Sequence, residues 1–77
     1  MRNMDDVTGD VVTTYESIQE MFQHWHKGRH TEFMAAMWQI HDLREEVALL
    51  TGNREQAHVI VSGIYRSVFS PVLLLQE

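Results

Sequence analysis

Histidine is the residue type that most strongly suggests chemistry in this chain, because five histidines occur among 77 residues. Three of them, His24, His26 and His30, stand close together around Gly28. Imidazole nitrogens bind zinc, copper and nickel, so this segment is a candidate metal site. The spacing is unfavourable, because residues two apart on a helix diverge by about 200° and Gly28 interrupts the i, i+4 pair. We keep metal binding as an alternative and expect no cofactor.

A second chemical pattern is Glu55-x-x-His58, the spacing that di-iron carboxylate bundles use. Such sites need two of these motifs and two further glutamates. Glu55 is expected about 150° from the apolar stripe of its helix and therefore points outward. No serine, threonine or histidine pattern places a nucleophile beside a base, and no glycine-rich phosphate loop is present. We expect that the protein is not an enzyme.

Composition limits the classes of function further. The net charge is −5, and six lysines and arginines are too few for strong binding to a phosphate backbone. No segment has the roughly 18–20 apolar residues that cross a bilayer, and the polar stretch Met1 to Asp10 is unlike a signal peptide. Cysteine is absent, which excludes a disulfide scaffold. We expect a soluble, cytoplasmic, single-domain protein that binds neither nucleic acid nor membrane.

Apolar periodicity predicts three amphipathic helices, the first over about residues 10–26. Asp10 or Thr13 is its expected cap, and Gly28 is expected to follow its end in the left-handed conformation. Its apolar positions follow a 4-3-4-3 spacing, which is typical of helices packed at a shallow angle. These positions are Val11, Tyr15, Ile18, Phe22 and Trp25.

The second and third helices are predicted over about residues 32–51 and 54–70. Thr31 is the expected N-cap of the second helix, and Gly52 and Asn53 are expected to end it and to cap the third. Pro71 is expected to stop the third helix. The predicted core positions are Phe33, Ala36, Ile40, Leu43, Val47 and Leu50, followed by Ala57, Ile60, Val61, Ile64 and Val68.

These elements predict an all-α fold, in which three antiparallel helices form a small bundle or a helical hairpin that dimerisation completes. Residues 1–9 are expected to be a flexible acidic N-terminus, residues 10–70 the three-helix domain, and residues 71–77 an apolar C-terminal tail. Short connections between helices of similar length favour antiparallel neighbours.

Several apolar residues lie outside the predicted core stripes. Measured from Ile40, the directions of Met34, Trp38 and Leu49 are about 120°, 160° and 180° away. In the third helix, small side chains at i and i+4 spacing allow another helix to approach closely. The predicted partner-binding residues are Met34, Trp38, Leu49, Val59, Gly63, Phe69, Val72, Leu73 and Leu74.

The sequence therefore predicts a small, non-catalytic protein-binding module that engages another protein through apolar helix surface and also self-associates. Adaptors, co-chaperones and inhibitory accessory proteins all suit this size and charge. Two alternatives stay open. One is a metal-binding helical protein that uses His24, His26 and His30, and the other is a purely structural homo-oligomer.

Overall fold

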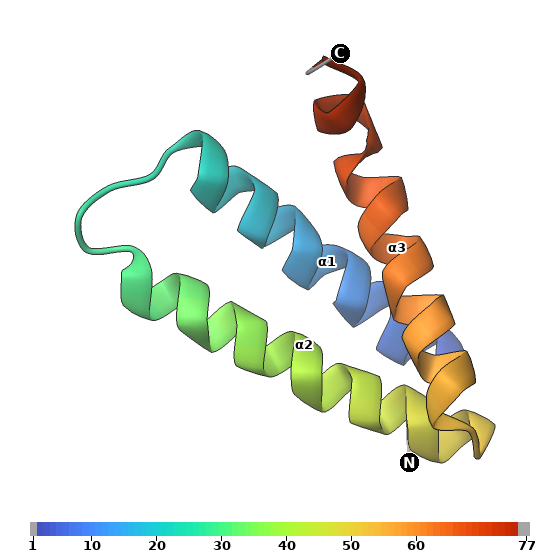
Figure 1. Cartoon of the computed structure of the whole chain (residues 1–77). Coiled ribbons are helices and arrows are strands. Elements are labelled where there is room, and N and C mark those ends of the chain that lie inside the picture. The colour runs from blue at the N-terminus through green and yellow to red at the C-terminus, as the bar shows by residue number, and fades with distance from the viewer. Residues whose placement is uncertain (1, 76–77) are drawn as a thin grey trace.

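The computed structural model describes the backbone of residues 2–75 and the side chains of residues 2–70. Within this part of the chain there are three helices and no strand: α1 (Met4–Gln23), α2 (His30–Thr51) and α3 (Arg54–Leu75). A loop joins neighbouring ends of α1 and α2, and α3 leaves the other end of α2 at a steep angle (Figure 1). Every pair of helices is in contact. The prediction of an all-helical fold built from three packed helices is confirmed.

Helix α1 begins earlier than its apolar periodicity suggests. Residues 4–9, which were expected to be flexible, form its first turns. The Asn3 side chain caps the helix, because its Oδ1 accepts a hydrogen bond from the Asp6 N–H at 2.9 Å. Asp6 also places negative charge near the positive end of the helix dipole. Val7 is fully buried, so packing against the rest of the molecule stabilises these turns.

The residues predicted to cap α1, Asp10 and Thr13, lie inside the helix instead. Asp10 forms an ion pair with Arg2, and Arg2 also pairs with Glu46 of α2 at 2.8 Å. Because these charges lie on the surface, water and salt screen them, and the two pairs contribute little to stability. Arg2, which precedes α1, is thus joined both to α1 itself and to the C-terminal part of α2.

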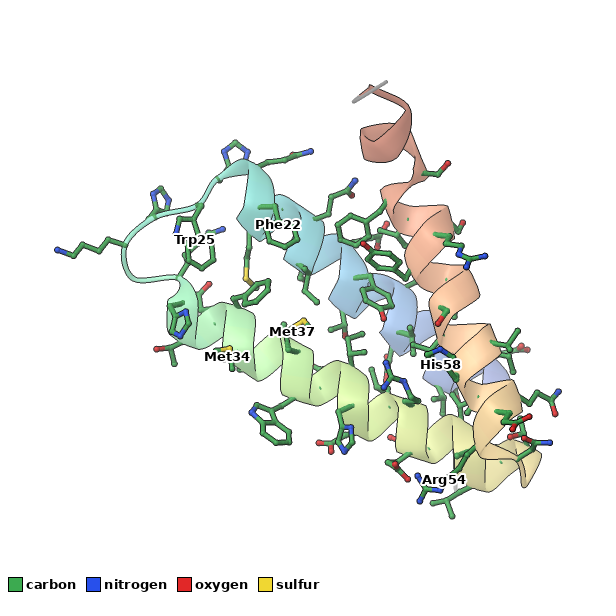
Figure 2. All side chains as sticks on the ribbon, in the orientation of Figure 1. Phe22, Trp25, Met34, Met37, Arg54 and His58 are labelled. Carbon is green, nitrogen blue, oxygen red and sulfur yellow. The ribbon has the colours of Figure 1, made fainter. Side chains whose placement is uncertain are left out.

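Helix α1 also ends earlier than predicted, at Gln23, so residues 24–26 belong to the loop. Phe22 and Trp25 were expected in the core, but their side chains are 58% and 49% exposed. Both lie at the loop end of the molecule (Figure 2). Their rings still pack on Phe33, with centroid distances of 5.4 and 5.9 Å. The result is an aromatic cluster at the edge of the core.

A tight turn leads into α2. The N–H groups of Gly28 and Arg29 both donate to the His26 carbonyl, at 2.9 and 3.1 Å. Arg29 occupies the N-cap position, so Thr31, the predicted cap, lies in the first turn of the helix. Gly28 does not have a positive φ and therefore does not adopt the expected left-handed conformation. This turn uses backbone hydrogen bonds in place of a left-handed cap.

The predicted turn between α2 and α3 is confirmed. Gly52 adopts the left-handed conformation with φ +70°, and its N–H donates to the Ala48 carbonyl at 2.8 Å. The Asn53 side chain then accepts a hydrogen bond from the Gln56 N–H at 3.1 Å. One glycine and one asparagine thus end α2 and start α3.

The apolar stripes of the three helices meet in one core. Its buried residues are Val7, Val11, Tyr15, Ile18, Met21, Ala36, Ile40, Leu43, Val47, Ala57, Val61 and Phe69. Phe69 was predicted to bind a partner, but its side chain is buried in this core and is therefore not part of the exposed surface. Its ring contacts the rings of Tyr15 and Phe22 of α1, at centroid distances of 6.2 and 6.3 Å.

Helix α3 continues through Pro71 to Leu75, so the prediction that Pro71 ends it is wrong. Proline lacks a backbone N–H and crowds the carbonyl four residues earlier. This removes one helical hydrogen bond, while the turns before and after it retain theirs. The expected tail over residues 71–77 is therefore helical as far as Leu75. Val72, Leu73 and Leu74 lie outside the described side chains.

Candidate protein-binding surface

An exposed apolar face lies on the middle of α2. We call this face the α2 ridge. It consists of Met34, Met37, Trp38 and His41, whose side chains surround a shallow, open depression. The Trp38 side chain is 65% exposed, and both methionines are also exposed. Met34 and Met37 lie along the ribbon of α2 in Figure 2. The ridge is a large apolar surface that the described part of the chain does not cover.

Trp38 is held in place by a neighbour on its own helix. The edge of one ring meets the face of the other between Trp38 and His41, with centroids 5.9 Å apart and planes at 90°. The flanking side chains of Met34 and Met37 are unbranched and polarisable, so they adapt to an irregular surface. The ridge thus combines an oriented aromatic side chain with adaptable neighbours, which suits contact with another protein.

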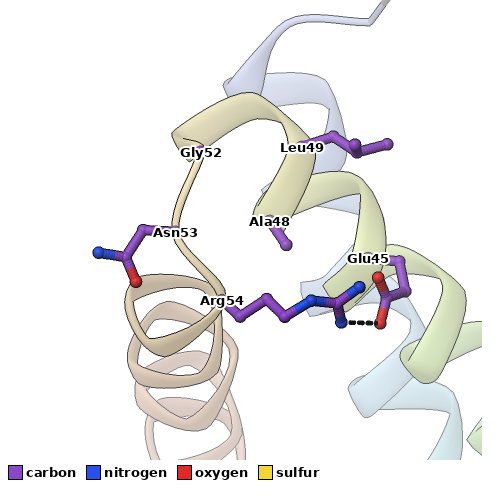
Figure 3. A pocket seen from close by; sticks show the side chains of 6 residues that line it. All are labelled: Glu45, Ala48, Leu49, Gly52, Asn53 and Arg54. Carbon is purple, nitrogen blue, oxygen red and sulfur yellow. Dashed lines mark hydrogen bonds and ion pairs between the residues drawn. The ribbon is translucent and has the colours of Figure 1, made fainter.

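Leu49 lies farther along α2, and its side chain is 78% exposed. It borders a separate hollow at the α2–α3 turn, together with Ala48, Glu45 and residues 52–54 (Figure 3). In this hollow Arg54 donates to the Glu45 carboxylate at 2.7 Å. That hydrogen bond holds the pKa of Glu45 below its ordinary value. The hollow is open and is lined by both polar and apolar groups, and Leu49 extends the apolar surface of α2 without lining the depression of the ridge.

A third surface lies on α3. The Val59 side chain is 67% exposed. It borders a hollow that also includes Gly63, and the other lining residues are His58, Ser62 and Arg66. A Cβ atom added at Gly63 would meet nothing within 4 Å. The packing of this chain therefore does not require glycine at position 63.

Gly52→Ala and Gly63→Ala are expected to change the free energy of unfolding in opposite directions. Gly52 has φ +70°, a conformation that costs alanine about 1–2 kcal/mol, so stability falls. Gly63 lies inside a helix with open space around it, so alanine raises stability by about 0.5–1 kcal/mol. Urea unfolding followed by circular dichroism measures both. Destabilisation by Gly63→Ala at dilute, monomeric concentrations would contradict the open surroundings of Gly63.

The structure places most of the predicted partner-binding residues on the surface but on two different helices. Met34, Trp38 and Leu49 are exposed on α2, and Val59 and Gly63 are exposed on α3. The sequence interpretation missed two members of the ridge, Met37 and His41. Their signal was present, since both lie within about 100° of Trp38 around the helix. Binding by these residues stays a prediction.

The histidines predicted as candidate metal ligands are not brought into a site. His24, His26 and His30 are all exposed around the loop. Among the described residues there is no group of three histidine, cysteine, aspartate or glutamate side chains that could hold a metal ion. Glu55 and His58 are likewise exposed on α3. The described geometry thus favours none of these residues as a metal centre.

One polar contact lies inside the core, between Tyr15 of α1 and Arg44 of α2. Burial raises the pKa of the Tyr15 phenol, and the Arg44 guanidinium beside the hydroxyl offsets part of this effect. The Nε atom of Arg44 is buried and has no hydrogen-bond partner within the described residues. The fold therefore favours the neutral phenol and leaves one donor of Arg44 unsatisfied.

The comparisons with known proteins identify no relative of this chain. No protein-family model, no curated protein and no solved structure matches this chain. Of the helices that the structure describes, none combines the length and the apolar character that a membrane crossing requires. The functional argument therefore rests on the surfaces of the molecule itself.

Proposed function

We propose that this protein is a small, non-catalytic binding module that engages a helix of another protein through the α2 ridge. In this mode an amphipathic helix lays its apolar side chains along an apolar surface. Adaptors, co-chaperones and inhibitory accessory proteins work in this way, and the proposal covers these three roles. Val59 and Gly63 of α3 offer a second contact surface in the same proposal.

The exposure of Trp38 carries the proposal. Removing an indole ring from water is worth a few kcal/mol, so a free Trp38 forgoes a large stabilisation. Tryptophan is also enriched among the residues that dominate binding energy at protein interfaces. The two methionines beside it add apolar surface that can repack around different partners. No described group offers comparable support for catalysis.

The proposal includes three further features. We propose that the helices run antiparallel, as the short connections over residues 24–29 and 52–53 favour. We propose that the protein self-associates, because its exposed apolar faces exceed what three helices cover. We also propose a cytoplasmic location, which suits a chain without cysteine.

Affinity capture from the protein's own host tests the proposal. The tagged wild-type chain is compared with Trp38→Asp and with Gln39→Asp, which places the same new charge on a neighbouring exposed position of α2. We expect a specific protein to be captured by the wild type and by Gln39→Asp, and to be lost with Trp38→Asp. Equal capture by all three chains, or no specific capture of any protein including the untagged chain, would refute binding through the ridge.

A further inference from the structure

The charges along α2 are distributed unequally around the ridge. The ridge is centred between Met37 and Trp38. Toward the start of α2 lie the exposed cation Lys27 and the exposed imidazole of His30, and toward its end lie the acidic residues Asp42 and Glu45. Arg29 and Glu32 at the start of α2 pair with each other at 3.9 Å. One apolar surface thus separates a basic end from an acidic end. A surface of this kind is complementary to itself when a second copy is turned by 180°.

The crossing geometry places these charges within reach of one another. If two copies of α2 cross antiparallel between Met37 and Trp38, then His30 of one lies opposite Glu45 of the other. These positions are about 11 Å from the crossing point at 1.5 Å per residue. At a shallow crossing angle of about 20°, the two helices separate by only about 4 Å more at that distance. The residues opposite each other at this point are a histidine and a glutamate, and the longer Lys27 side chain lies three residues before His30.

Among the described residues, the ionic contacts within one chain engage only Glu45 of these four groups, and they leave one of its two carboxylate oxygens available. Arg54 binds Glu45 through Oε1, and Oε2 has no such bond among the described residues. No ion pair within the described residues involves Lys27, His30 or Asp42. At physiological salt the screening length is about 8 Å, so contacts within an interface outweigh repulsion between the two net charges of −5.

From this charge pattern we infer that the α2 ridge pairs with the ridge of a second copy in an antiparallel, two-fold symmetric dimer. The inference rests on the proposed function, because it names the second copy as the partner at the same ridge. Antiparallel packing also aligns the helix dipoles favourably. The interface is small, since one helix face is buried on each side, and the dimer dissociates in the micromolar range.

Two charge-reversal variants test the arrangement. The basic-end variant carries Lys27→Glu and His30→Glu, and the acidic-end variant carries Asp42→Lys and Glu45→Lys. Alone, each variant brings like charges together at both ends of the dimer, and its dissociation constant rises at least about tenfold. Mixed in equal amounts, the two variants pair opposite charges again and recover the wild-type dissociation constant to within about threefold. Circular dichroism of each variant checks its folding.

Sedimentation analysis and native mass spectrometry distinguish the outcomes. A heterodimer that forms preferentially in the mixture supports the antiparallel arrangement. A wild-type chain that stays monomeric at about 100 µM overturns the inference. The inference is also overturned if the equal mixture of the two variants associates no more tightly than either variant alone. A monomeric chain that still captures another protein through Trp38 overturns the inference and the proposed self-association but retains the proposed binding of another protein. A monomeric chain without such capture removes both the inference and the proposed function.

Discussion

Replacing Trp38 by alanine is expected to abolish self-association of this protein at micromolar concentrations. A central interface tryptophan contributes about 2 kcal/mol or more, which corresponds to about 30-fold in the dissociation constant. A two-fold symmetric dimer contains this side chain twice, so the combined loss approaches about 1,000-fold. Sedimentation equilibrium over a range of concentrations measures it. Because Trp38 is mostly exposed, the variant retains the stability of the monomer to within about 0.5 kcal/mol.

Leu49→Ala is the matched control for this prediction. Leu49 is even more exposed than Trp38 and lies on the same helix. In a dimer that crosses between Met37 and Trp38, however, it lies beyond the overlapping segment. Its replacement is therefore expected to change the dissociation constant less than about threefold. A larger loss with Leu49→Ala than with Trp38→Ala would move the binding surface toward the α2–α3 turn.

Tyr15→Ala is expected to remove a large part of the free energy of unfolding. The Tyr15 ring is buried and makes edge-to-face contacts with Tyr65 and Phe69, at centroid distances of 5.5 and 6.2 Å. Removing a buried aromatic side chain costs about 3–5 kcal/mol. A chain of 77 residues has a total free energy of unfolding of about 4–12 kcal/mol. Urea titration followed by circular dichroism measures the loss.

Phe22→Ala tests the same type of change on the exposed side of α1. The Phe22 ring contacts Phe33 and Phe69 but remains mostly in water, so its removal is expected to cost about 1 kcal/mol or less. A second control is Tyr15→Phe, which keeps the buried ring and removes only the hydroxyl beside Arg44. Its comparison with Tyr15→Ala separates the contribution of the ring from that of the hydroxyl. A cost for Phe22→Ala as large as that for Tyr15→Ala would show that Phe22 is buried in solution by a contact absent from the isolated chain.

The parts of the fold that the sequence predicted are those in which a single residue decides the backbone. Gly52 and Asn53 each favour one conformation for a local reason, and the turn between α2 and α3 follows from them. The core positions of α2 were predictable because Ile40, Leu43 and Val47 repeat with the helical period. In α2 and the turn that follows it, the conformational preferences of single residues and the spacing of apolar residues both agree with the observed structure.

The errors arose where long-range packing decides the outcome. The start of α1 is polar, and the burial of Val7 against the other helices stabilises it. The end of α1 was placed too late because Trp25 continues the heptad spacing, although the chain has already left the helix. The Asn3 cap was not predicted, because an asparagine at this position caps a helix only if packing extends the helix to residue 4.

The exposed residues of α2 could be predicted from the sequence of that helix alone, whereas those of α3 could be predicted less well. Helical geometry correctly placed Trp38 outside the core, because its direction depends only on its own helix. Phe69 was wrongly placed outside because its burial depends on how α1 lies against α3. Met37 was overlooked because it lies at the border between the core stripe and the exposed ridge.

Neither tryptophan of this protein lies in its core, since Trp25 is in the loop and Trp38 on the ridge, and both contact water. Indole emission shifts to shorter wavelengths when water leaves the ring. In the monomeric chain about half or more of each tryptophan side chain is already exposed, so unfolding shifts the emission less than it would for a tryptophan in the core. A molecule that docks on the α2 ridge dehydrates Trp38 and shifts the emission to the blue. The chain thus carries an intrinsic fluorophore that responds weakly to its own folding and strongly to the arrival of a partner.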